Sequence, residues 1–161
     1  MRKTLIAAAL IAALAAPIAA SATTSTSYTL DVNLASVHTE AWARRDLNQH
    51  NLGLGATAHF TPDWSVSAGW YRNSYRRTSA YALLNWTPLH WGLPAGWRIA
   101  AGGTAGFDSG YRTSEIACQP FVAAGLLRVL APAGWSLNLT AVPNAPGRRS
   151  GFIGAQISMP L

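Results

Sequence analysis

Two short stretches of the chain carry the side chains best suited to covalent chemistry. The first is His38, within residues 36–39, and the second is the pair Asn73 and Ser74, within residues 71–77. A histidine and a serine are the minimal set for acyl transfer, because the imidazole acts as general base and the hydroxyl as nucleophile or oxyanion donor. Taken alone, such a histidine is more often a solvated polar residue, and Asn-Ser is common in turns. The elements that position the two stretches therefore decide between these interpretations.

The N-terminal segment predicts that the protein is secreted from the cytoplasm. Met1–Lys3 is basic, Leu5–Ala16 is apolar without a break, and Ala20–Ala22 fits a small-x-small cleavage site. This is the pattern of a secretory signal peptide, and its apolar run is too short for a membrane-spanning anchor. We expect a signal peptide over residues 1–22 and one mature domain over residues 23–161.

Composition and patterning favour an all-β fold in a membrane. Half of the chain is apolar and only 11% is charged, yet no apolar run is long enough for a membrane-spanning helix. Apolar and polar residues instead alternate with period two, which is typical of half-buried strands. The alternation covers eight segments, at residues 28–34, 48–60, 64–70, 80–86, 97–107, 121–129, 135–141 and 153–161.

These segments predict an eight-stranded antiparallel, up-and-down transmembrane β-barrel of the outer-membrane type. Single-chain bacterial barrels have an even strand number, and a sheet with an open edge is not stable in lipid. Tryptophans near strand ends suit an aromatic girdle, at Trp64, Trp86, Trp97 and Trp135. A soluble lipocalin-like barrel is the alternative, but it would require an apolar interior, whereas one face of most segments is small or polar.

Basic residues gather in four of the connections between strands. The chain has ten Lys and Arg residues besides Arg2 and Lys3, and all ten are arginines. The planar guanidinium of arginine pairs bidentately with phosphate. Eight of the ten fall in or beside the connections expected at the outer rim, where lipopolysaccharide carries phosphate. The candidates for lipid A phosphate binding are Arg44, Arg45, Arg72, Arg76, Arg77, Arg112, Arg148 and Arg149. The alternatives are a rim that only tethers the barrel to lipopolysaccharide, and biased codon usage.

Other classes of site have little support in the sequence. The four histidines have no metal-ligand spacing, the chain has a single cysteine, and no glycine-rich phosphate loop is present. We therefore expect no metal and no cofactor. A secreted barrel also argues against a nucleic-acid partner, although basic and aromatic residues are interleaved.

The order of motifs resembles the lipid A palmitoyltransferase (PagP) family of outer-membrane barrel enzymes, in a divergent branch. The resemblance covers nearly the whole mature chain and rests on Val37–Thr39, Asn51–Gly55, Arg72–Ser74, Gly102–Phe107, Gln119–Pro120, Ala133–Gly134 and Val142–Pro143. It implies transfer of an acyl chain, typically palmitate, from a glycerophospholipid of the outer leaflet to a hydroxyl of lipid A. The active rim would face outward, and we expect the barrel to act as a monomer.

The resemblance also implies roles for individual residues. The family's catalytic histidine and serine correspond to His38 and Ser74, so His38 would be the general base and Ser74 the nucleophile or oxyanion donor. The family's aspartate corresponds to Asn73, whose amide oxygen would fix the imidazole tautomer or whose NH₂ group would bind the oxyanion. The family's depth-setting glycine corresponds to Asn85.

Small and rigid residues predict the path of the lipid. Inward glycines leave room for an acyl pocket, and its candidate residues are Gly69, Asn85, Gly102 and Gly106. Because Asn85 is larger than glycine and polar, it would form the floor of a shallower pocket. Pro120 and Pro143 lie near the outer ends of adjacent strands and lack ladder N–H groups, so they would open a lateral entrance for lipid, unless they simply end their strands.

Two further functions compete with lipid A acyltransfer. The first is a non-enzymatic small barrel that binds lipopolysaccharide or host surfaces. The second is a barrel lipid A deacylase, which ranks last because such enzymes carry a His-x-Ser pair on one strand and no histidine here has serine two residues on.

Overall fold

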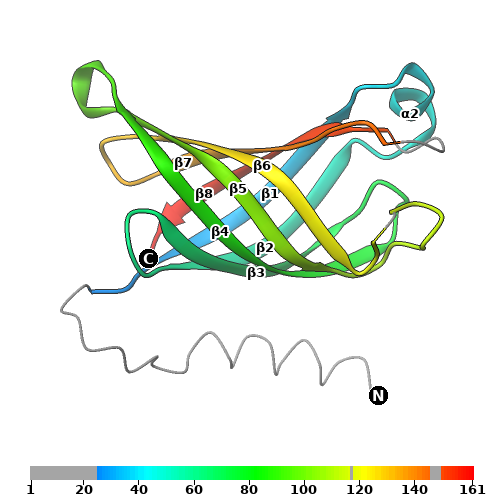
Figure 1. The fold of residues 1–161 in the computed structure, drawn as a ribbon, viewed down its shortest axis with the longest axis horizontal. Coiled ribbons are helices and arrows are strands. Elements are labelled where there is room, and N and C mark those ends of the chain that lie inside the picture. Colours follow the sequence, from blue (N-terminus) through cyan, green and yellow to red (C-terminus); the bar gives the residue numbers. More distant parts are fainter. Residues whose placement is uncertain (1–24, 117, 146–149) are drawn as a thin grey trace.

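The chain folds into one closed barrel of eight antiparallel strands, as the sequence predicts. The computed structural model describes residues 25–116, 118–145 and 150–161, so the predicted signal peptide lies outside the described residues. Each strand pairs with its neighbours in sequence, and β1 pairs with β8 to close the sheet (Figure 1). The strands are β1 (Ser27–His38), β2 (His50–His59), β3 (Trp64–Arg72), β4 (Thr78–Gly92), β5 (Arg98–Asp108), β6 (Phe121–Leu130), β7 (Ser136–Val142) and β8 (Phe152–Pro160).

The two faces of the sheet differ in polarity, as the period-two pattern predicts. Every strand presents a large apolar side chain on the outside of the barrel, namely Leu30, Leu54, Trp70, Leu84, Phe107, Leu127, Leu137 and Ile153. The four predicted girdle tryptophans are also 41–48% exposed. Trp64 stacks on Trp86 across the β3–β4 ladder, with ring centroids 5.8 Å apart.

The inside of the barrel is lined by hydroxyls, amides and one buried carboxylate. Asp31 is fully buried and accepts hydrogen bonds from Thr57 Oγ1 at 2.5 Å, Ser158 Oγ at 2.5 Å and Thr29 Oγ1 at 3.2 Å. Thr57 Oγ1 also lies 2.8 Å from Ser67 Oγ. These contacts join β1, β2, β3 and β8, so a continuous polar layer crosses the barrel near the end where β1 begins and β8 ends.

One strand is longer than the alternation suggests. The alternating segments at residues 80–86 and 97–107 leave residues 87–96 outside any predicted strand, but β4 continues to Gly92, and only η1 (Pro94–Gly96) and its flanking residues form the turn. Pairing with β3 stops at Trp64 and Trp86, whereas pairing with β5 resumes at Leu89 after a register shift. Pro88 therefore lies where β4 has no partner on the β3 side, which is a position that tolerates proline.

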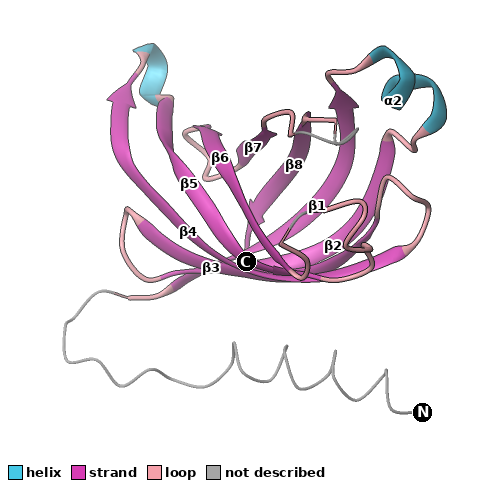
Figure 2. Ribbon diagram, turned by 45° about the vertical axis from the view of Figure 1, so that its right-hand side comes forward, coloured by secondary structure: helices cyan, strands magenta, loops and turns pink. Residues whose placement is uncertain are grey.

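The candidate catalytic residues lie in or beside the connections at the end of the barrel away from the start of β1. A short helix, α2 (Ala41–Asp46), lies in the connection between β1 and β2, which the sequence analysis expected to be a plain loop. Both views place α2 at the end of the barrel away from the start of β1 and the C-terminus (Figures 1 and 2). Within the described residues, no helix has the length and apolar character needed to cross a membrane.

The polar layer predicts a measurable contribution of Asp31 to stability. Replacing Asp31 with alanine leaves three buried hydroxyls without their acceptor, so the free energy of unfolding should fall by about 3 kcal/mol. Thermal unfolding in detergent, followed by circular dichroism and by heat-modifiable gel migration, measures the change. Asp63→Ala is the control, because Asp63 is exposed and its pair with His90 should add little. Equal stability of the two variants would contradict the assigned role of the layer.

Candidate functional site

His38 and Ser74 are both buried and line the same cavity. His38 is the last residue of β1 and Ser74 lies in the turn after β3, and they are 3% and 7% exposed. The cavity has a volume of about 470 Å³ and runs down the inside of the barrel from these two residues to Asn85 and Ser158. The two stretches singled out in the sequence therefore meet at one cavity.

The imidazole of His38 is held by a residue that the sequence analysis did not identify. His38 Nδ1 lies 3.2 Å from Gln49 Oε1, and the backbone N–H of His38 donates to the same oxygen at 3.2 Å. The ring also packs against Phe152, with centroids 5.8 Å apart. Gln49 lies just before β2, and no sequence pattern marks it, because its importance comes only from its position beside the end of β1.

The residue before Gln49 braces the second candidate. The backbone N–H of Asn48 donates to the carbonyl of Ser74 at 2.8 Å, and Asn48 Nδ2 donates to the carbonyl of Asn73 at 3.3 Å. Two consecutive residues of the β1–β2 connection thus contact all three candidate catalytic residues, since Gln49 contacts His38 and Asn48 contacts Asn73 and Ser74. The geometry fixes His38 and Ser74 relative to one another although they are far apart in sequence.

Asn73 is fully buried, but its side chain is used within its own turn. Its Oδ1 accepts the backbone N–H groups of Tyr75 at 2.9 Å and Arg77 at 3.0 Å. Its Nδ2 donates to Ser79 Oγ at 3.1 Å and to the carbonyl of Gly110 at 3.0 Å. The expected contact with the imidazole is not made, and Gln49 occupies that place instead. Asn73 shapes the turn that carries Ser74.

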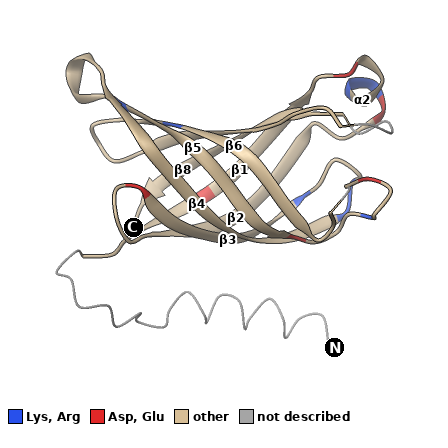
Figure 3. Cartoon of the chain, in the orientation of Figure 1, with Lys and Arg blue, Asp and Glu red and all other residues tan. Residues whose placement is uncertain are grey.

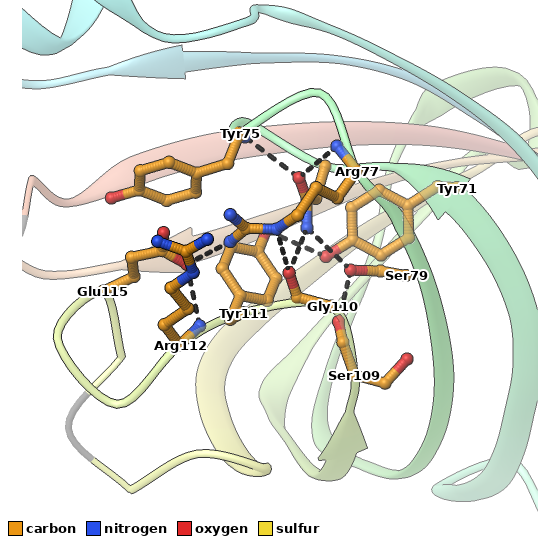
Figure 4. Close-up of polar contacts among 10 residues, drawn as sticks. Tyr71, Tyr75, Arg77, Ser79, Ser109, Gly110, Tyr111, Arg112 and Glu115 are labelled. Atoms are coloured by element: carbon orange, nitrogen blue, oxygen red, sulfur yellow. Dashed lines mark hydrogen bonds and ion pairs between the residues drawn. The ribbon is translucent and has the colours of Figure 1, made fainter.

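A cluster of aromatic and charged side chains ties this turn to the β5–β6 connection (Figure 4). Arg77 Nε donates to the carbonyl of Gly110 at 2.7 Å, and its guanidinium forms an ion pair with Glu115. The same guanidinium lies over the ring of Tyr75, 5.2 Å from its centroid, and Tyr75 meets Tyr111 edge to face at 6.0 Å. Arg77 therefore holds two loops together.

Two buried tyrosine hydroxyls connect the cluster to the cavity. Tyr71 donates to Asp108 Oδ2 at 2.6 Å and lies 3.1 Å from the hydroxyl of Tyr111, which in turn bonds to the backbone of Ser74. Burial raises the pKa of Tyr111 well above its usual value, so its hydroxyl stays neutral around Ser74 over the physiological range.

Asn85, the predicted floor of the acyl pocket, and the glycines predicted beside it have different surroundings in the structure. Asn85 lines the cavity, and its amide donates to Ser67 Oγ at 2.7 Å and Ser65 Oγ at 3.3 Å. The space beside Gly69 is filled by the hydroxyl of the buried Tyr81, which lies 2.7 Å from where a Cβ of Gly69 would be. A Cβ at Gly102 would lie 1.9 Å from the carbonyl oxygen of Trp86.

The three glycines are therefore not walls of the cavity. A Cβ at Gly106 would meet the carbonyl oxygen of Ala82 at 2.2 Å, so this glycine, like Gly102, permits a close approach of β4 and β5. Apolar side chains of β6 line the cavity instead, namely Val122, Ala124 and Leu126. Gly69, Gly102 and Gly106 are not among the residues that line this cavity, because sequence alternation gives the face of a residue but not what fills the space in front of it.

The wall of the barrel is incomplete between β6 and β7. Their ladder runs from Gly125 to Leu130, so the first four residues of β6 have no partner on β7. Pro120 directly precedes β6 and Pro143 directly follows β7, so both bound the unpaired stretch. The cavity touches Phe121 to Ala124 on β6 and Val142 and Pro143 at the end of β7, so the unpaired stretch of the wall borders the cavity.

The predicted arginines differ in their surroundings. Arg77 is engaged by Glu115, Arg44 donates to the carbonyls of His38 at 2.9 Å and Thr39 at 2.5 Å, and Arg76 donates to the carbonyl of Asp46 at 3.4 Å, so these three have structural partners. Arg45, Arg72, Arg76 and Arg112 are exposed, whereas Arg148 and Arg149 lie outside the described residues. Most of the basic residues drawn in Figure 3 lie at the end of the barrel that carries α2.

Two of the exposed arginines share a groove on the outer wall. Arg72 and Arg76 line it with an imidazole, an amide and two large apolar side chains, and its other residues are Asn48, His50, Leu52, Trp70, Tyr71 and Thr78. The groove lies where the β2–β3 ladder has ended, since pairing begins only at Gly53 and Tyr71. It combines positive charge with an apolar base.

Within the described residues, no group of histidine, cysteine, aspartate or glutamate side chains is arranged to hold a metal ion. Comparison of the chain with protein-family models gives no match, and comparison with curated proteins gives none either. The functional argument therefore rests on the fold and on the geometry of the site.

Proposed function

We propose that this protein is an outer-membrane acyltransferase that moves an acyl chain from a glycerophospholipid to a hydroxyl of lipid A. The observation that carries the proposal is the cavity that runs from the buried pair His38 and Ser74 to the stretch of barrel wall where β6 and β7 are unpaired. The apolar belt on the outside of all eight strands supports a place in a membrane, because only a closed sheet satisfies its backbone in lipid.

The chemistry follows from the residues at the mouth of the cavity. His38 takes the proton of the acceptor hydroxyl as its oxygen attacks the ester carbonyl of the donor, and the ester C–O bond to glycerol breaks. The proton then passes from the imidazole to the glycerol oxygen, so the reaction is balanced without a cofactor. In this direct route, Ser74 donates a hydrogen bond to the developing oxyanion. In the alternative route, Ser74 Oγ attacks the donor ester first while His38 passes the serine proton to the departing glycerol oxygen, and the acceptor hydroxyl then attacks the Ser74 ester while His38 passes its proton back to Oγ.

The two lipids approach from different sides of the barrel. The donor chain enters between β6 and β7, where Pro120 and Pro143 flank the unpaired part of the wall. The outer groove with Arg72 and Arg76 supplies charge for the phosphate of lipid A and apolar surface, from Leu52 and Trp70, for its chains. Arg45 and Arg112 are further cations at the same end.

The catalytic assignment predicts loss of transfer with intact folding. His38→Ala and Ser74→Ala should each lower acyl transfer at least about 100-fold, because each removes a group that acts on the reacting atoms. Mass spectrometry of lipid A from cells that express each variant measures the product. His90→Ala is the matched control, since His90 lies exposed at the other end of the barrel. Wild-type transfer by both variants would contradict the assignment.

The same experiment separates the enzyme from a binding barrel. If the wild-type protein leaves the lipid A spectrum unchanged but retains lipopolysaccharide in a pull-down from detergent, the non-enzymatic function replaces the proposed one.

The groove predicts a phosphate-dependent acceptor affinity. The double variant Arg72→Met and Arg76→Met should weaken binding of bisphosphorylated lipid A about tenfold, while binding of lipid A without phosphates should change little. Titration in detergent micelles measures both affinities. Arg98→Met is the control, because Arg98 is an exposed arginine at the opposite end. Equal losses for the two lipids would show that the arginines do not recognise phosphate.

The floor of the cavity predicts the preferred donor length. Asn85→Gly removes the amide that bonds to Ser65 and Ser67, so the cavity deepens and the optimum should move toward longer acyl chains. Transfer rates from phospholipids of graded chain length measure the optimum. Leu84→Gly is the matched control, because Leu84 faces outward on the same strand. An unchanged optimum in Asn85→Gly would exclude Asn85 as the floor.

A further inference from the structure

Four polar contacts surround the side-chain amide of Gln49. Its Oε1 lies 3.2 Å from both the backbone nitrogen and Nδ1 of His38. Its Nε2 donates to the carbonyl of Ala43 at 3.3 Å and to the carbonyl of Leu47 at 3.2 Å. Both carbonyls belong to α2 or to the residue that ends it, so the amide bridges the helix and the end of β1.

These contacts allow only one orientation of the amide. In the reversed orientation, the NH₂ group would face the backbone N–H of His38, and the oxygen would face two carbonyl oxygens. Both arrangements bring like groups together, donor against donor at His38 and acceptor against acceptor at Ala43 and Leu47, and so replace four attractive contacts with repulsive ones. Gln49 Oε1 is therefore the atom that faces the imidazole, and this atom can only accept.

Because Gln49 Oε1 can only accept a hydrogen bond, it determines which ring nitrogen of His38 carries the proton. A neutral imidazole has one N–H and one lone pair, and the nitrogen beside an acceptor carries the proton. Nδ1 of His38 is that nitrogen, so Nε2 holds the lone pair. We propose that Gln49 is a positioning residue that keeps His38 in the Nδ1–H tautomer, making Nε2 the atom that accepts the proton during acyl transfer.

This inference rests on the proposed function and assigns to Gln49 the orienting part that a carboxylate plays in other acyl-transfer sites. A neutral amide fixes the tautomer but adds no charge to stabilise the imidazolium. The contact also links the base to α2, since the carbonyls of Ala43 and Leu47 hold the amide in place. Asn48, the next residue toward the N-terminus, makes the corresponding brace to Ser74.

The tautomer can be measured without any reaction. We would record nitrogen NMR spectra of the folded barrel with ¹⁵N-labelled histidine in detergent, at a pH where His38 is neutral, using His38→Ala to assign its signal. The wild-type protein should show a protonated Nδ1. Gln49→Met has nearly the same shape but no acceptor, so it should shift His38 toward the Nε2–H form that imidazole prefers in water. Gln119→Met, on the β5–β6 connection, should leave the His38 signal unchanged. A wild-type tautomer in Gln49→Met would overturn the inference.

Activity provides the second readout. Gln49→Met should lower kcat about 10- to 100-fold with little change in KM, the size of effect found when a metal-binding histidine loses the partner that orients it. Gln49→Glu keeps an acceptor for Nδ1–H but turns its second oxygen toward the carbonyls of Ala43 and Leu47, so it should recover only part of kcat. Its added negative charge favours the imidazolium, so the acid limb of the pH profile should move about one unit to higher pH. A structural role alone would not move this limb.

The two readouts separate the possible failures. If the wild-type protein transfers no acyl chain, the proposed function fails and the spectrum still decides whether Gln49 fixes the tautomer. If the wild-type protein is active and Gln49→Met keeps full kcat, the inference fails and the proposed function stands. If Gln49→Met does not reach the heat-modifiable folded form, Gln49→Glu decides, and an unshifted pH profile then overturns the proposal.

Discussion

Closure of the sheet is the constraint on which the rest of this molecule depends. Every strand of an eight-stranded barrel has two neighbours, so the backbone groups are satisfied wherever two ladders run side by side. The ladders are continuous around the polar layer of Asp31, and they stop early at the α2 end, between β2 and β3 and between β6 and β7. The candidate site and both proposed lipid approaches lie where pairing has ended.

The interior follows from the same closure. A barrel of this size has just enough room for its own side chains, and most of that room is taken by hydrogen-bonded hydroxyls and amides and by the ring of Tyr81. Tyr81 projects from β4 into the space beside Gly55 and Gly69, so these glycines of β2 and β3 serve the packing of one tyrosine. The remaining cavity is lined by Asn85 and its serine partners deep in the barrel and extends to His38 and Ser74 at the α2 end.

Order at the open end comes from the connections rather than from the sheet. Asn48 and Gln49 brace the turn of Ser74 and the ring of His38, and α2 holds Gln49 in turn. On the other side, Arg77 and Asn73 join the Ser74 turn to the β5–β6 connection through Gly110. Each brace uses polar contacts between segments distant in sequence, so His38 and Ser74 are held without a continuous ladder between them.

The sequence by itself determined the barrel, the polarity of its two faces and the two stretches that meet at the cavity. This was possible because side chains alternate strictly along a strand, so residue types alone show which face is apolar, and because eight such segments leave closure as the way to satisfy the edges. Only the tertiary structure decided the partners inside. It placed Gln49 rather than Asn73 beside the imidazole, Tyr81 in front of Gly69, and Glu115 on Arg77. Alternation gives the direction in which a side chain points, whereas its partner depends on strand register and loop geometry, which join residues that no local pattern connects.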